Sequence, residues 1–295
     1  MIFTQEHEGI RKTVSQFIDK EINPYCDQWE KDGIFPAHEL FKKMGDLGLL
    51  GINKPVECGG LGLDYSYQIV FTEELGRIRS GGVSMAIGVQ TDMATPALAK
   101  YGSDYLQKEF LSKAITGDAV FSIAVSEPHA GSDVAAIKTK AVKEGDDYII
   151  NGSKMWITSS TQADYLCVLL NTEGDNRHKN KSMVIVPTNL PGVSFSEKLD
   201  KLGMRSSDTA QVFFDNVRVP QKNLVGEEGM GFIYQMEQFQ EERLYCAAAN
   251  LKCLEFCIED TIEYVKERHV FGKPILNNQV VYFRLAELQT EISAL

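Results

Sequence analysis

The chain has 295 residues, with 30 Lys and Arg against 41 Asp and Glu, and hence a formal net charge of −11. Hydrophobic residues make up 43% of it and charged residues 24%, a composition that is typical of soluble globular proteins and excludes a disordered chain. The acidic balance and the lack of a basic cluster argue against general nucleic-acid binding.

Signals for membrane insertion, secretion and metal binding are weak. No apolar run approaches the ~20 residues that a membrane-spanning helix needs, and residues 1–7 lack the basic and apolar parts of a signal peptide. Six cysteines are too few for a disulfide scaffold in so long a chain. Cys246, Cys253 and Cys257 would share one side of a helix, but no histidine stands beside them at ligand spacing. We therefore expect small buried side chains there, no metal site, and a soluble intracellular protein.

Apolar residues recur with a helical period through residues 1–118. Ile10, Val14 and Phe17 predict a first helix that ends before Pro24. Pro36 suits the first turn of a second helix. Further helices are expected over residues 64–77, 83–100 and 103–115.

The pattern changes to short β-branched and aromatic runs in residues 119–225. Glycine, asparagine and aspartate separate these runs, as is typical of a small antiparallel β-barrel or sandwich, of which we expect the barrel. The expected strands cover residues 119–126, 148–151, 154–158, 165–170, 183–187 and 211–214.

The helical pattern returns in residues 226–295. One long helix is expected from Gly231 to about Arg268 and another from Asn278, and the chain ends at Leu295 inside that second pattern. We therefore expect an α+β multidomain protein: an all-α domain (1–118), an antiparallel β-barrel domain (119–225) and a truncated C-terminal α-helical bundle (226–295).

Two stretches of the middle domain suggest ligand binding. Residues 124–136 form a strand that ends in a turn of small residues, where a flat or anionic ligand can approach the main chain. In residues 152–159, Trp156 and Thr158 would share one face of a strand, so that an indole covers a planar ring while a hydroxyl reaches its edge. Each stretch by itself is more simply interpreted as an ordinary turn and as a tryptophan packed in a β core.

The order and spacing of four stretches, taken together, favour ligand binding over these simpler interpretations. Residues 124–136, 152–159, 214–220 (FDNVRVP) and 268–275 (RHVFGKPI) together resemble the signatures of the acyl-CoA dehydrogenase family of flavoproteins. The resemblance spans the whole chain and favours the branch of long-chain, isovaleryl- and citronellyl-CoA dehydrogenases.

The resemblance implies a set of FAD-binding residues. These are Ile123, Ala124, Val125, Ser126, Gly131, Ser132, Trp156, Ile157 and Thr158, with Thr158 close to flavin N5. Arg268, Phe271 and Gln279 would reach the FAD of a neighbouring subunit, which implies a homo-oligomer, a dimer or a tetramer. From the residues alone, Arg268 is better interpreted as a solvated helix end that pairs with Glu267 or Glu263.

Glu242 is the candidate catalytic base. Its neighbours on a helical wheel are uncharged, and a partly desolvated carboxylate has a raised pKa that suits a base. Sequence physics alone favours an exposed glutamate paired along the helix. The resemblance favours the base, because the isovaleryl and long-chain branch carries a glutamate directly before the helix arginine, as in Glu242-Arg243. Arg243 and Ser132 would then bind the CoA substrate.

The implied reaction is FAD-dependent α,β-dehydrogenation of a long-chain or branched acyl-CoA to trans-2-enoyl-CoA. Electrons would pass to an electron-transfer flavoprotein, the acyl pocket would follow residues 89–96, and the compartment would be the mitochondrial matrix or the bacterial cytoplasm. Two alternatives stay open: a flavin oxidase or monooxygenase on the same scaffold, and a non-catalytic interaction protein that lacks the last helices of the family.

Overall fold

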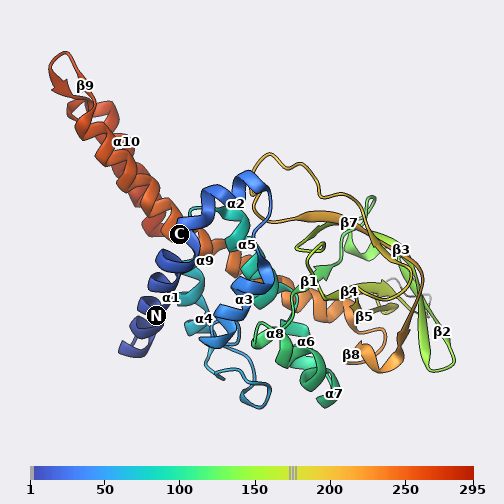
Figure 1. Ribbon diagram of the computed structural model, residues 1–295. Helices are drawn as coiled ribbons and strands as arrows, with labels where there is room; N and C mark the ends of the chain where they lie inside the picture. Colours follow the sequence, from blue (N-terminus) through green and yellow to red (C-terminus); the bar gives the residue numbers. More distant parts are fainter. Residues whose placement is uncertain (1–2, 173, 175, 177) are drawn as a thin grey trace.

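The computed structural model describes residues 3–172, 174, 176 and 178–295 of the chain. Helices, a mixed β-sheet and two long helices follow one another along the sequence (Figure 1). The long helix α9 (Gly231–Glu267) contacts both the sheet and the N-terminal helices, so it joins all three parts.

The N-terminal part is helical, as its hydrophobic period predicts. One expected helix, over residues 83–100, is broken into α5, a π-helical turn and α6, because Pro96 lacks an N–H and begins a new helix. The α-helices are α1 (Gln5–Phe17), α2 (Cys26–Asp32), α3 (Ala37–Asp46), α4 (Tyr65–Leu75), α5 (Gly81–Gly88), α6 (Pro96–Tyr101), α7 (Asp104–Leu106) and α8 (Ser112–Ile115). The π-helical turns are η1 (Ile18–Ile22), η4 (Val89–Met93) and η5 (Gln107–Leu111), and the 3₁₀ turns are η2 (Asn23–Tyr25) and η3 (Val56–Cys58).

The middle part is an eight-stranded sheet in which β7 and β3 form the longest pair. The strands are β1 (Phe121–Ala124), β2 (Lys140–Glu144), β3 (Asp147–Thr158), β4 (Tyr165–Asn171), β5 (Lys181–Pro187), β6 (Val193–Phe195), β7 (Thr209–Pro220) and β8 (Leu224–Val225). The two strands expected at 148–151 and 154–158 are one strand, β3. It shifts register between Ile150 and Gly152 and again between Lys154 and Ile157. Gly152 has φ 147°, and a Cβ there would lie 2.4 Å from Thr139 Oγ1, so the first shift requires glycine.

The expected closed antiparallel barrel is wrong. The strand order is β6-β7-β3-β2-β4-β5-β8, with β1 beside β4, and the two end strands β6 and β8 do not pair with each other in the described part of the sheet. Strand β4 pairs in parallel with β1 and, at one position, with β2, so the sheet is also mixed. Helix α9 contacts β4 and β5, and α6 contacts β8, so helices pack against this end of the sheet.

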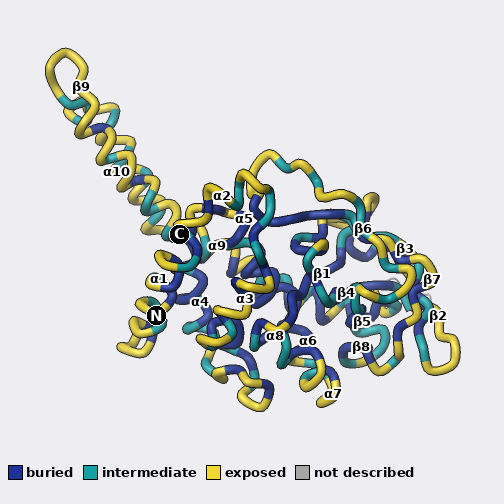
Figure 2. The backbone as a smooth tube through the Cα atoms, viewed as in Figure 1, coloured by how far each residue is buried: buried dark blue, intermediate teal, exposed yellow. Residues whose placement is uncertain are grey.

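The C-terminal part is α9, the short β9 (His269–Val270) and β10 (Lys273–Pro274) hairpin, the 3₁₀ turn η8 (Ile275–Asn277) and α10 (Gln279–Ala294). The end of α9 and all of α10 project from the body as an arm with the hairpin at its tip (Figure 1). Figure 2 shows that this arm is largely exposed, and no residue of α10 is buried. None of the described helices is long and apolar enough to cross a membrane.

Two apolar clusters form the core, and α9 contributes to each. Tyr245 belongs to the cluster that joins the N-terminal helices to one side of the sheet, and Tyr234 to the cluster around Phe110 and Met183. Because α9 is anchored at both points, a side chain between them is held between the sheet and the helices.

Candidate active site

The two ligand-binding stretches of the middle domain lie against each other. The N–H of Met155 donates to the carbonyl of Ser126 at 2.8 Å, and the hydroxyl of Ser122 donates to the carbonyl of Thr158. The loop after β1 and the last residues of β3 therefore form one surface.

A buried ion pair that the sequence analysis missed fixes this surface. Lys154 is fully buried, and its Nζ donates to Glu127 Oε1 at 3.0 Å and to the carbonyl of Val125 at 2.9 Å. Glu127 also accepts from the backbone N–H groups of Lys138 at 2.6 Å and Thr139 at 2.9 Å. Burial lowers the pKa of Lys154 to about 8 in spite of Glu127. Breaking such a buried pair from one side costs about 3–5 kcal/mol, so the pair holds the loop and strand in one arrangement.

Trp156 is exposed and does not pack in a β core. Its φ is 66°, in the left-handed region, and 63% of its surface is accessible. It lies in the second register shift of β3, where Lys154 and Ile157 are both buried, so the simple alternation expected for the strand is interrupted. A large ring held in solvent by a strained backbone is typical of a ligand platform.

The other residues predicted to bind FAD differ in how far their side chains are buried. Ser126 and Thr158 are half-buried next to Trp156, and Gly131 and Ser132 are exposed in the loop. Ile123 is half-buried, whereas the side chains of Ala124, Val125 and Ile157 point into the core, so these three can offer a ligand only their main chain.

Glu242 lies on the inward side of α9 and is half-buried. Gln235 Nε2 donates to Glu242 Oε1 at 3.3 Å. Burial raises the pKa of Glu242 to about 8; the amides of Gln238 and Gln235 and the charge of Arg243 lower it in part, and the charge of Asp92 raises it. A carboxylate with this pKa is suited to accept a proton near neutral pH.

Strands β4 and β1 lie between helix α9 and β3. Helix α9 contacts β4, where burial and then the charge of Glu242 raise the pKa of the Cys167 thiol. Cys167 is the register partner of Ile123 in β1. The residue before Ile123 is Ser122, whose hydroxyl binds the carbonyl of Thr158. The carboxylate and the end of β3 are thus separated by the paired strands β1 and β4.

A buried polar cluster on the helical side was also missed. Asp92 of η4 accepts from Gln68 Nε2 at 2.8 Å, from the Thr91 hydroxyl at 2.6 Å and from the Tyr65 hydroxyl at 3.5 Å. Tyr65 reaches the carbonyl of Glu241 on α9 at 3.4 Å. Burial raises the pKa of Asp92 to about 6. These residues come from α4, η4 and α9, and no local sequence signal joins them.

Arg243 is exposed on α9, and its guanidinium lies 5.7 Å from the ring centroid of Phe239. Arg268, Phe271 and Gln279 are exposed around the tip of the arm. Figure 1 shows that this tip lies away from the sheet, so one chain does not bring these three residues to Trp156.

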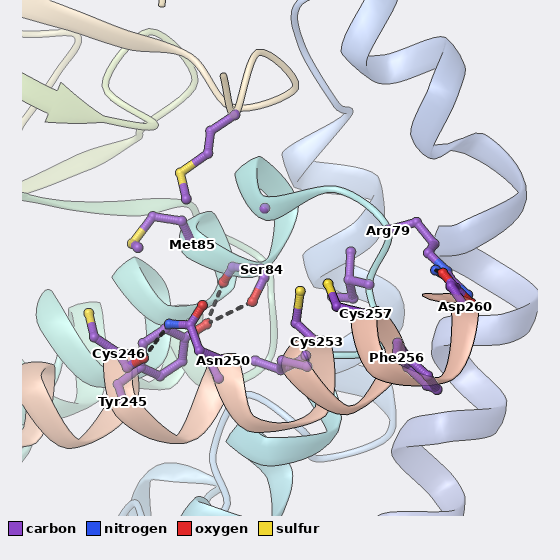
Figure 3. A pocket seen from close by; sticks show the side chains of 16 residues that line it. Arg79, Ser84, Met85, Tyr245, Cys246, Asn250, Cys253, Phe256, Cys257 and Asp260 are labelled. Atoms are coloured by element: carbon purple, nitrogen blue, oxygen red, sulfur yellow. Dashed lines mark hydrogen bonds and ion pairs between the residues drawn. The ribbon is translucent and has the colours of Figure 1, made fainter. Parts of the chain in front are cut away.

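A cavity of about 300 Å³ lies between α9 and the connection from α4 to α5 (Figure 3). Its lining includes Met85, Tyr245, Cys246 and Cys253, and residues 89–96 do not line it. Tyr245 is fully buried and donates its hydroxyl to the carbonyl of Ser84.

The expected burial of three cysteines is wrong. Cys246, Cys253 and Cys257 are exposed, because this side of α9 borders the open cavity and not the core. In the part of the chain that the structure describes, no group of three His, Cys, Asp or Glu residues could hold a metal ion.

Comparison with known proteins identifies similar proteins over the full length of the chain. The profile of the acyl-CoA dehydrogenase N-terminal domain matches residues 4–118, that of the middle domain 122–217 and that of the C-terminal domain 229–295. The mitochondrial 2-methylacyl-CoA dehydrogenase of Solanum tuberosum is 36% identical over 295 residues, which is 100% of this chain and 71% of that protein. The mitochondrial long-chain specific acyl-CoA dehydrogenase of Sus scrofa is 38% identical over 294 residues, 99% of this chain and 67% of that protein.

A crystal structure of acyl-CoA dehydrogenase from Geobacillus kaustophilus has a TM-score of 0.94 and 40% identity, covering 99% of this chain and 77% of that one. The fold and the sequence therefore define the same class, and the chain belongs to the acyl-CoA dehydrogenase family. It is an oxidoreductase that acts on acyl-CoA, in a family of flavoproteins.

Proposed function

We propose that this chain removes a proton from the α-carbon and a hydride from the β-carbon of an acyl-CoA thioester, with Glu242 as the base. The observation that supports this role is the half-buried Glu242 carboxylate, bonded to Gln235 and with its pKa raised to about 8. At neutral pH an ordinary glutamate is too weak a base for a thioester α-proton, and burial strengthens it.

The residues of the middle domain fit an FAD. Trp156 offers an exposed planar face, and a Cβ added at Gly131 would meet nothing within 4 Å, so the loop is open to a ligand. Ser126, Ser132 and Thr158 would supply hydroxyl groups, and residues 123–125 and 157 their main chain. A bound FAD would supply the acceptor for the β-hydrogen, which leaves as a hydride. A solved glutaryl-CoA dehydrogenase from Mycobacterium smegmatis in complex with FADH2, 30% identical over 98% of this chain, supports this assignment.

Three side chains of this chain would then act on the substrate. Glu242 takes the α-proton and becomes a neutral acid, while the β-hydrogen leaves with its electron pair, so the product is a trans-2-enoyl-CoA. Exposed Arg243 would hold the CoA part by charge, and Ser132 would lie near the thioester. Electrons would leave to an electron-transfer flavoprotein; a solved structure described as the electron transferring flavoprotein of Acidaminococcus fermentans is 32% identical and covers 100% of this chain.

The acyl group would extend along α9 into the cavity of Figure 3. Cys246, one turn after Glu242, lines this cavity, and burial together with the charge of Glu242 raises the pKa of Cys246. The mainly apolar lining, including Leu75, Met85 and Ala249, suits a hydrocarbon. The relatives named for 2-methylacyl and long-chain acyl groups agree with a long or branched chain.

A second subunit would complete the FAD site. Arg268, Phe271 and Gln279 are exposed at the tip of the arm, away from Trp156 of the same chain (Figure 1). We assign them to the FAD of a neighbouring subunit in a dimer or tetramer.

The test is an anaerobic titration of FAD-loaded protein with butyryl-, isovaleryl-, octanoyl- and palmitoyl-CoA, following loss of the oxidised flavin absorbance. We expect the wild-type protein to bleach and Glu242→Gln to bleach at least about 1000-fold more slowly with unchanged FAD content. Glu259→Gln, at an exposed glutamate of the same helix, is the matched control and should behave as wild type. Rapid bleaching of Glu242→Gln would show that another group is the base. Fast reoxidation of the reduced protein in air would favour the oxidase alternative.

A further inference from the structure

Gln235 is a buried residue for which the reaction outlined above has no role. It precedes Glu242 by seven residues on α9, so the two side chains lie on the same side of the helix, two turns apart. Gln235 is 0% exposed, and its Nε2 donates to Glu242 Oε1 at 3.3 Å. Its other amide atom, Oε1, has no hydrogen-bond partner among the described residues.

Gln238, on the next turn, also lowers the pKa of Glu242, but both ends of its amide are already bonded to backbone groups. Its Nε2 donates to the carbonyl of Met93, and its Oε1 accepts from the N–H of Ala97 at 3.0 Å. Both ends of that amide hold α9 to η4 and α6. Among the residues that the structure describes, the amide of Gln235 has no such backbone bonds, and its one bond is to the carboxylate.

A side-chain amide can serve a carboxyl group in two ways. Its N–H donates to the ionised carboxylate, and after half a turn about the terminal torsion its oxygen accepts the O–H of the neutral acid. The hydrogen bond to the ion is the stronger of the two. A buried amide with a free oxygen beside a group that gains a proton is therefore built for both states.

We infer that Gln235 is a positioning residue that hydrogen-bonds Glu242 before and after proton transfer. The inference rests on the proposed role of Glu242 as the base. In the resting state Gln235 Nε2 orients the carboxylate. When the α-proton reaches Glu242, the new O–H donates to Gln235 Oε1, which gains the partner it lacks in the resting arrangement. The proton stays on Glu242 until the product leaves, and the negative charge leaves the substrate with the β-hydride.

Apart from the amide of Gln238, whose two ends are bonded to backbone groups, the other groups around Glu242 act as charges or by burial. The charges of Asp92 in η4 and Arg243 on α9 act on the pKa of Glu242, and its own charge acts on the pKa values of Cys167 in β4 and Cys246 on α9. Asp92 itself is bonded to Gln68, Thr91 and Tyr65. The Gln235 amide is thus the group that can change its bonding when Glu242 changes its charge.

The test is the pH dependence of the rate of flavin bleaching in the FAD-loaded full chain, using whichever of the four acyl-CoAs above bleaches the wild type fastest. Gln235→Met keeps the length and the helix propensity of the side chain but loses both amide atoms. We expect the pKa of the acidic limb to rise by about one pH unit, because the stronger bond to the ion is lost. We also expect the rate at high pH to fall about tenfold, because the new O–H lacks its acceptor.

Two further variants sharpen the result. Gln235→Glu places a second carboxyl group beside the first, and like charges should raise the acidic limb further than Gln235→Met does. Gln240→Met, at an exposed glutamine of the same helix, is the control and should leave the whole profile unchanged. If either the limb or the high-pH rate of Gln235→Met matches wild type, the inference is wrong. If Glu242→Gln still bleaches rapidly, the proposed function fails instead, whatever the Gln235 variants do.

Discussion

Replacing Glu242 by glutamine should stabilise the folded protein above neutral pH. Burial raises the pKa of this carboxyl from its ordinary 4.5 to about 8, so the folded state prefers the neutral acid. The stabilisation from that preference is complete below pH 4.5 and is lost as the pH rises from there through 8. Glutamine is neutral at every pH and avoids the loss.

The size of the effect follows from the same numbers. A pKa of about 8 in place of 4.5 corresponds to about 5 kcal/mol at about 1.36 kcal/mol per pH unit. Because Glu242 is only half-buried, solvent screening reduces this, and we expect about 2 kcal/mol at pH 8. The wild-type protein and Glu242→Gln should therefore have equal stability near pH 4.5 and diverge steadily up to pH 8.

Urea unfolding at pH 5, 6, 7, 8 and 9 measures this difference directly. Glu259→Gln is the control, because an exposed glutamate should change the free energy of unfolding by less than about 0.5 kcal/mol at every pH. A stability difference between Glu242→Gln and wild type that does not grow with pH would refute the reasoning, because the carboxyl would then be hydrated in the folded state.

Two more predictions concern the middle domain. Lys154→Met leaves Glu127 buried without its cation, so the free energy of unfolding should fall by about 3–5 kcal/mol. The double variant Lys154→Met/Glu127→Gln should recover part of this loss. Equal denaturant midpoints for the wild type and the single variant would contradict the prediction. Trp156→Ala removes an exposed side chain, so the free energy of unfolding should change by less than about 0.5 kcal/mol while FAD dissociates at least tenfold more readily. Equilibrium dialysis against FAD checks the second effect, and unchanged FAD affinity would remove Trp156 from the site.

Local sequence was enough for the features that depend on neighbours along the chain. The 3.6-residue period identified α1, α3, α4 and α9 but not α2, and short β-branched runs identified most strands of the sheet. The ordered motifs of residues 124–136, 152–159, 214–220 and 268–275 identified the family, which the comparisons confirm. Glu242 could be singled out because its helical neighbours are uncharged, but the period alone left an exposed glutamate as the better interpretation.

The tertiary structure decided what depends on partners far apart in the sequence. The sheet is open because β6 and β8 end it, which no strand pattern reveals. Lys154 meets Glu127 across 27 residues, and Asp92 meets Gln68 across 24. Trp156 is exposed because a register shift of β3 against β7 turns the strand there, and the pKa of Glu242 is raised because α9 is packed at once against the sheet and the helices. Burial of a charge depends on what covers it, and covering groups come from the whole fold.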